Sequence, residues 1–222
     1  MLHIGPHTYE LVRVQSGFVL WIEQPDWRCP SGQNWRLDAH FVPGDHGPSR
    51  RSDGVDEYLR LAIFPHDYSV RDWRELKGLG LEPLEDESKD VVWLGLVSVE
   101  NLLAPRTAQE LWHVNPGELK VRRTGDYLFT CEFDGIIKLD HREEELHFLD
   151  EIPFAEVCQR VPVNAREPVA YAHARAMREI GPFEIADSRV TTNDWPLKKD
   201  PNARPADAHE VVLRTAWQCR TA

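Results

Sequence analysis

The chain has 222 residues and carries 26 Lys and Arg residues against 37 Asp and Glu residues, a formal net charge of -11. No stretch concentrates the basic residues, so DNA, RNA and an anionic membrane surface would be repelled at long range. No window approaches the run of about 18 apolar residues that a membrane-spanning helix needs. We therefore expect neither a nucleic-acid nor a membrane partner, and basic or neutral proteins remain.

The N-terminal segment and the cysteines indicate a compartment. Residues 1–7 lack the basic start and apolar core of a secretory signal, which predicts a cytoplasmic protein. No C-x-x-C pair occurs among the four cysteines, which are Cys29, Cys131, Cys158 and Cys219. This spacing argues against a zinc ribbon or a thioredoxin-type centre, so we expect free thiols and no cofactor.

Common catalytic signatures are missing from the sequence. It has no Gly-rich phosphate loop ending in Gly-Lys-Ser/Thr, no G-x-G-x-x-G motif and no G-x-S-x-G motif. The usual nucleotide and acyl-transfer chemistries are therefore disfavoured. A site assembled from distant residues would leave no such local signature.

Alternating segments predict strands through the first hundred residues. Strands at 8–14 and 18–23 are expected to form a first hairpin, followed by strands at 35–41 and 58–64. In the segment 35–41, apolar residues alternate with Arg36, Asp38 and His40, which predicts one core face and one wet face. Ser69 and Asp72 resemble a capping box and predict a short helix that ends before Gly78.

An acidic stretch at 82–90 reads as a solvated loop, and 91–97 is apolar on both faces, as is typical of a central strand. A second short helix is expected to begin near Thr107. A meander of strands at 118–123, 127–133 and 136–139 follows, with Asp134-Gly135 as its second turn.

The clearest helix is predicted near 165–180, between a capping box at Asn164 and Glu167 and the stop Gly181-Pro182. Strands at 183–190 and 209–217 complete the chain. The order of elements predicts one domain over residues 1–222, of the α+β class and mostly antiparallel β, with one clear helix and two short ones. A sandwich and a partly open barrel both fit this pattern.

Two groups of residues could bind a ligand. Asp38 and His40 share a strand face that leads into Asp45 and His46, so carboxylate and imidazole groups could gather there. Trp27 and Trp35 bracket a loop, where aromatic side chains could contact a ligand or a protein. A wet sheet face and a filled core explain the same residues, and we favour these simpler interpretations.

One charged segment could hold a metal or act in acid–base catalysis. As a strand, it places His141, Glu143, Glu145 and His147 on one face, with alternate residues about 6 to 7 Å apart. A solvated edge strand, whose charges prevent further pairing, carries the same pattern, and we favour it.

These features favour a cytoplasmic, non-catalytic binding protein whose protein partner is unidentified; an immunity or antitoxin role, in which the chain neutralises a basic toxin, is one concrete form. The alternative is an enzyme or a small-ligand-binding β-barrel with a His/carboxylate site; whether the chain is an enzyme stays open. A deep pocket with converging imidazole and carboxylate groups would favour the alternative, and a convex, acidic, pocket-free surface would favour the binding protein.

Overall fold

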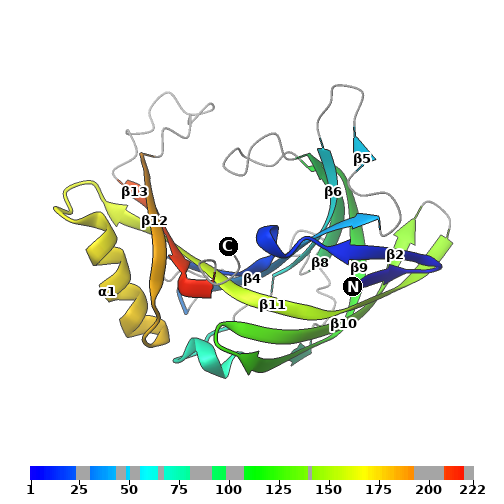
Figure 1. The fold of residues 1–222 in the computed structure, drawn as a ribbon, viewed down its shortest axis with the longest axis horizontal. Coiled ribbons are helices and arrows are strands. Elements are labelled where there is room, and N and C mark those ends of the chain that lie inside the picture. The colour runs from blue at the N-terminus through cyan, green and yellow to red at the C-terminus, as the bar shows by residue number, and fades with distance from the viewer. Residues whose placement is uncertain are drawn as a thin grey trace.

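The computed structural model describes residues 1–23, 31–43, 49–50, 56–64, 68–80, 92–98, 108–139, 142–192 and 208–217. This part of the chain is mostly antiparallel β-sheet with one α-helix, which confirms the predicted fold class (Figure 1). No helix within it is long and apolar enough to cross a membrane. The strands are β1 Leu2–Ile4, β2 His7–Leu11, β3 Gly17–Ile22, β4 Gln33–Pro43, β5 Ser49–Arg50, β6 Asp56–Ile63, β7 Leu79–Gly80, β8 Val92–Ser98, β9 Ala108–Gly125, β10 Leu128–Leu139, β11 Arg142–Pro162, β12 Ile185–Thr192 and β13 Ala208–Thr215.

All described strands belong to one sheet, in the order β1-β2-β4-β3-β11-β10-β9-β8-β6-β5. β4 pairs with β6 as well as with β2 and β3, so β6, near the end of this order, lies beside β4, near its beginning. β13 and β12 extend from the far end of β11. In Figure 1 the sheet is strongly curved, with β12, β13 and the helix α1 on one side and β6, β8 and β9 on the other.

The long strand β11 organises this arrangement. Its first half pairs with β10 and β1, and its second half pairs with β13 and, in parallel, with β3. A register shift between Phe154 and Glu156 marks the bend where it changes partners. Gly17 lies against this bend, and a Cβ atom there would collide with the Cβ of Ala155. A residue without a side chain is therefore required at the crossing.

The core lies on the inner face of the curved sheet. Leu94, Phe129, Cys131 and Leu213 are almost inaccessible to solvent, as expected for central strands. The side chains of Leu96 and Val97, for which the same burial was expected, lie outside the described residues. Residues 91–97 were expected to be central, and β8 does pair on both sides, with β6 and β9.

The expectation of a wet face on β4 is wrong. Trp35, on the predicted core face, is 1% exposed, but Asp38 and His40 on the opposite face are only 3% and 0% exposed. Asp38 and His40 are therefore buried on the face that was expected to be wet, and the charge of Asp38 is compensated by the buried Arg60 and the partly exposed Arg36 instead of water.

Two predicted turns are also wrong. β2 and β3 do not form a hairpin, because β4 lies between them. Asp134 and Gly135 do not close a turn: β10 runs straight through them, and Asp134 pairs with His147 while Gly135 pairs with Leu146. The turn propensity of Asp-Gly is overridden by the long partner β11, and a register shift against β9 absorbs the irregularity.

The helical predictions have mixed outcomes. The helix near 165–180 is confirmed as α1 Pro168–Ile180, with Gly181 at φ 79° after its end. The helix expected after Ser69 is a single 3-10 turn, η2 Trp73–Glu75, capped by Asp72. The helix expected from Thr107 is wrong, since 108–114 form the start of β9, where pairing with β8 and β10 overrides the local signal. Residues 82–90 lie outside the described part of the chain.

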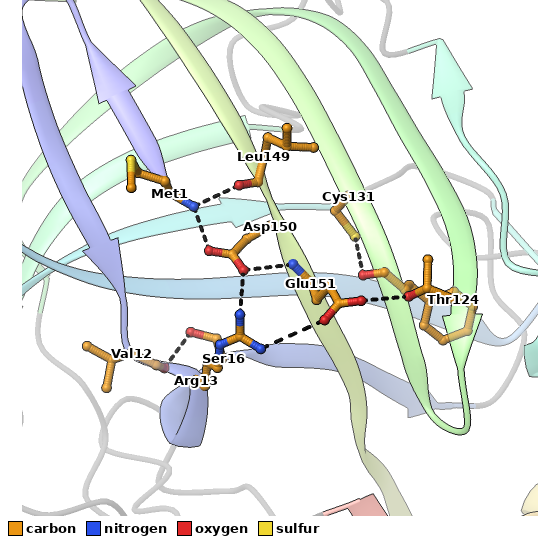
Figure 2. Close-up of polar contacts among 10 residues, drawn as sticks. Met1, Val12, Arg13, Ser16, Thr124, Cys131, Leu149, Asp150 and Glu151 are labelled. Carbon is orange, nitrogen blue, oxygen red and sulfur yellow. Dashed lines mark hydrogen bonds and ion pairs between the residues drawn. The ribbon is translucent and has the colours of Figure 1, made fainter.

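The N-terminal segment is fixed to β11 by charged contacts (Figure 2). Asp150 accepts hydrogen bonds from the Met1 amino group at 2.6 Å and from Arg13 Nη2 at 3.1 Å. Arg13 belongs to the short 3-10 helix η1 Arg13–Gln15. These contacts, together with the pairing of β1 and β11, bring His3 beside His147.

Candidate functional site

A surface cleft of about 370 Å³ opens on the outer face of β9, β10 and β11, away from the core. It arises where the register of β9 and β10 shifts between Phe133 and Gly135. Two glycines line it: a Cβ atom on Gly135 would lie 2.8 Å from Val114 Cγ1, and one on Gly117 would lie 2.5 Å from the Asp134 carbonyl oxygen. The two glycines therefore allow the strands to approach closely here.

A row of polar side chains crosses four strands at the edge of this cleft. Asp134 pairs with His147, His147 with His3, and His3 with Thr8 in the registers of β10, β11, β1 and β2. His147 Nδ1 lies 2.6 Å from Asp134 Oδ1, and the rings of His147 and His3 stack with centroids 6.3 Å apart. Thr8 Oγ1 lies 3.2 Å from His3 Nδ1. Strand pairing thus assembles this row from four separate parts of the sequence.

The contact between Asp134 and His147 fixes the chemistry of the imidazole. The Asp134 carboxylate can only accept a hydrogen bond, so the Nδ1–H of His147 donates it; in the neutral tautomer that carries this proton, Nε2 holds the lone pair. No described group occupies Nε2. His147 can therefore accept a hydrogen bond or a proton from a molecule that enters the cleft.

Three of the four residues suggested as metal ligands are described. Glu143 and Glu145 are exposed on β11, on the same face as His147, as the period of 2 predicts, while His141 lies outside the described residues. Glu145 and His147 line the cleft. No group of three or more His, Cys, Asp or Glu residues within the described chain is placed to hold a metal ion.

Asp38 and His40 lie in a different place, on the buried outer face of β4. Asp38 is in contact with two arginines, Arg36 Nε and Arg60 Nε, each at 2.5 Å. Burial alone would raise the pKa of Asp38, but the positive charges of Arg36 and Arg60 hold the pKa below its ordinary value. Asp45 and His46, expected to join this group, lie outside the described residues.

Of the two aromatic candidates, the structure describes only one. Trp35 is part of the core, packed against Phe154, with its Nε1 donating to Gln33 Oε1 at 3.1 Å. Trp27 lies outside the described residues. Trp35 thus has the structural role that we favoured from the sequence.

Sequence reasoning missed several residues of both groups. Asp134 was assigned to a turn, and His3 lies 144 positions before its partner His147, a distance that no local pattern bridges. Arg36 lies two residues before Asp38, on the same face of the predicted strand. A search for a cation that neutralises the Asp38 carboxylate could therefore have identified Arg36 from the sequence. Arg60 carries no such local signal.

The chain matches no known protein family, no characterised protein and no solved structure. Its function therefore has to be inferred from the chemistry of these two sites.

Proposed function

We propose that this chain is a cytoplasmic, non-catalytic binding protein that engages a basic segment of a protein partner at the cleft on β9, β10 and β11. The observation that carries the proposal is the charge of the surface around the cleft. Five carboxylates and two lysines define this acidic outer face, namely Glu118, Glu132, Asp134, Glu143, Glu145, Lys120 and Lys138.

The face defined in this way keeps a net negative charge, because its five carboxylates outnumber its two lysines. Lys120 is engaged by Glu132 at 3.0 Å, and the Nζ–Oε1 contact raises the pKa of Lys120. Asp134 contacts only an imidazole within the described chain. The net charge of -11 acts in the same direction, because it would speed the encounter with a basic protein.

The cleft also offers an apolar contact next to its carboxylates. Ile136 is 43% exposed and pairs with Glu145 across β10 and β11. An arginine or lysine side chain combines an apolar stem with a charged end, so it could lie along Ile136 and reach Asp134 and Glu145. A partner with such a side chain fits this cleft better than a wholly apolar ligand does.

The openness of the cleft favours binding over catalysis. The side chains of His147 and Asp134 are 43% and 57% exposed, whereas catalytic sites gain much of their effect by excluding water. The buried free thiols Cys131 and Cys158 fit a reducing compartment such as the cytoplasm. A protein that covers a basic toxin, as immunity proteins and antitoxins do, is one concrete form of this function.

Peptide binding tests the proposal. A fluorescent peptide rich in arginine and lysine is titrated with the protein, in low salt and again in higher salt, and an acidic peptide of equal length serves as a comparison. We expect only the basic peptide to bind, and the double variant Asp134→Asn, Glu145→Gln to weaken binding about tenfold or more. The matched control is Glu167→Gln, Glu184→Gln, which removes the same charge from exposed positions beside α1 and β12. Equal losses in both variants would show that only net charge matters and would overturn the assignment to this cleft.

The alternative of a small-ligand or catalytic site is favoured by one observation, the orientation of His147 by Asp134 at the cleft edge. Such a pair can act as a general base when a substrate lies within hydrogen-bond reach. A thermal-shift screen of small metabolites, repeated with His147→Gln, separates the two functions. A metabolite whose stabilising effect disappears in the variant would support this alternative, whereas binding of the basic peptide does not require Nε2.

A further inference from the structure

The second group, on the outer face of β4, β6 and β8, has one positive charge in excess, at the partly exposed Arg36. Two guanidinium groups, of Arg36 and Arg60, meet the single carboxylate of Asp38. The side chains of Asp38 and Arg60 are only 5% and 8% exposed. The group as a whole therefore carries a net positive charge, which favours an anion at this place.

No neighbouring carboxylate of the described chain supplies that anion. Along the sheet, Val19 pairs with Arg36 on one side and with Glu156 on the other, which makes Glu156 the next acidic residue in this row. Glu156 is already engaged by Arg214, with Oε1 and Nε 3.3 Å apart. Its charge is therefore not available to Arg36.

Aromatic rings hold both arginines in place. The Arg60 guanidinium lies 4.6 Å from the ring centroid of Trp93, and that of Arg36 lies 5.5 Å from the ring centroid of Phe64. The rings of Phe64 and Trp93 are themselves stacked, with centroids 6.0 Å apart. Because the rings restrict the planar guanidinium groups, their paired N–H donors can bind an oxyanion with little further loss of side-chain conformational entropy.

Donor groups remain for such a ligand. Arg60 uses Nε for Asp38, and within the described chain its two Nη atoms donate to no protein acceptor. Arg36 Nε lies close to Asp38 Oδ2, but its N–H is not directed at the carboxylate and is buried without a hydrogen-bond partner. Opposite Asp38 lie Gly17 and Ala62, and opposite Arg60 lie His40 and Gly95, so small residues flank Asp38 on both sides.

We infer that Arg36 and Arg60, positioned by Asp38 and by the rings of Phe64 and Trp93, form a binding site for an oxyanion, a phosphate or carboxylate group of a small molecule. Arg36 is 26% exposed and marks the side from which the ligand enters. This site is separate from the cleft on β9, β10 and β11, and its occupant is of opposite charge to the partner proposed there.

Inorganic phosphate and acetate are the probes that test this inference. Thermal stability is measured with each anion at increasing concentration, against sodium chloride at matched ionic strength. We expect saturable stabilisation by at least one of the two anions. A comparison of the stabilisation by phosphate with that by acetate shows which group the site prefers. Stabilisation that follows ionic strength alone would overturn the inference.

Three variants assign the effect to the site. Arg36→Gln, at the partly exposed position, should weaken anion binding about tenfold or more. Arg123→Gln is the matched control, because Arg123 also lies over a tryptophan ring, 5.6 Å from the centroid of Trp73, but in another part of the fold. Asp38→Asn should change the anion affinity in the opposite direction. Without the Asp38 carboxylate both arginines can bind the anion, so the affinity should rise about tenfold or more.

The sign of the Asp38→Asn effect separates a ligand site from a purely structural cluster. A structural role predicts that Asp38→Asn lowers stability equally in phosphate and in chloride, and that result would overturn the inference. Tighter anion binding by this variant, with partial recovery of its stability, would support it.

Discussion

Tyr127 lies parallel to Trp73, with ring centroids 4.8 Å apart and an interplanar angle of 8°. Tyr127 is the non-glycine residue with positive φ, 61°, in the described chain, at the turn between β9 and β10. Its hydroxyl accepts a hydrogen bond from the Glu184 N–H at 2.7 Å, and its carbonyl accepts one from the Phe154 N–H at 2.7 Å. One side chain thus joins this turn to η2 and to the segment before β12.

This relationship predicts a graded loss of stability at Tyr127. Tyr127→Phe keeps the stacking and removes one hydrogen bond, which should lower the free energy of unfolding by about 1 kcal/mol. Tyr127→Ala also removes the buried ring and should cost about 3 to 5 kcal/mol. Urea denaturation measures both values. Equal losses in the two variants would mean that the ring contact with Trp73 contributes nothing.

A second prediction concerns acid stability through Asp38. Because its pKa in the folded protein is lowered, its contribution is present above the unfolded pKa of about 3.9 and is lost as pH falls through the folded value. Removal of one partner from a buried ion pair costs about 3 to 5 kcal/mol, so Asp38→Asn should be destabilised by this amount near pH 7.

The difference between wild type and Asp38→Asn is the quantity to follow. It should shrink when denaturation is repeated at decreasing pH below 4, because the carboxyl takes up a proton first in the unfolded protein and only at still lower pH in the folded protein, where Arg36, Arg60 and His40 face it. Glu143→Gln, at an exposed position, serves as the control. A difference that stays constant down to the lowest pH would contradict the lowered pKa.

Local patterns predicted the elements better than their partners. The alternation in 35–41 correctly indicated strand β4, and the signals around Pro168 and Gly181 correctly indicated α1, because both depend on nearby residues. The first hairpin failed since the pairing of β4 between β2 and β3 is decided by distant contacts. At 108–114 and at Asp134-Gly135, long strand partners likewise overrode local propensity.

Prediction of the sites was limited in the same way, because the partners of the predicted residues come from other strands. The period of 2 correctly placed Glu143, Glu145 and His147 on one face, but their nearest functional neighbour, Asp134, comes from the next strand. Asp38 and His40 were expected on a wet surface because charged residues are rarely buried. Their burial depends on Arg60, which lies 22 positions beyond Asp38 and pairs with it only in the folded sheet.

A third prediction concerns the buried thiols. Burial raises the pKa of Cys131 and of Cys158 well above the ordinary value. Their contribution to stability is therefore complete below the unfolded pKa of about 8.5 and is lost as pH rises above it, by about 1.4 kcal/mol per pH unit for each thiol. Urea denaturation between pH 7.5 and pH 10 measures this slope.

The double variant Cys131→Ala, Cys158→Ala provides the comparison. It should be less stable at pH 7.5, because two buried side chains become smaller, but its stability should fall less steeply with rising pH. Parallel curves for wild type and variant would show that these thiols do not contribute to the alkaline loss.

The last prediction is that the face of Glu143, Glu145 and His147 takes up no stoichiometric divalent metal. His147 offers only Nε2 for a ligand bond, since Nδ1 is engaged by Asp134 at 2.6 Å. Glu143 and Glu145 are exposed, and no described hydrogen bond orients their carboxylates as a metal site requires. Elemental analysis and calorimetric titration with zinc, manganese and nickel are the measurements, and a His141→Ala, His147→Ala variant is the control. Metal bound one to one by the wild type and absent from the variant would contradict the prediction and make this face a metal centre.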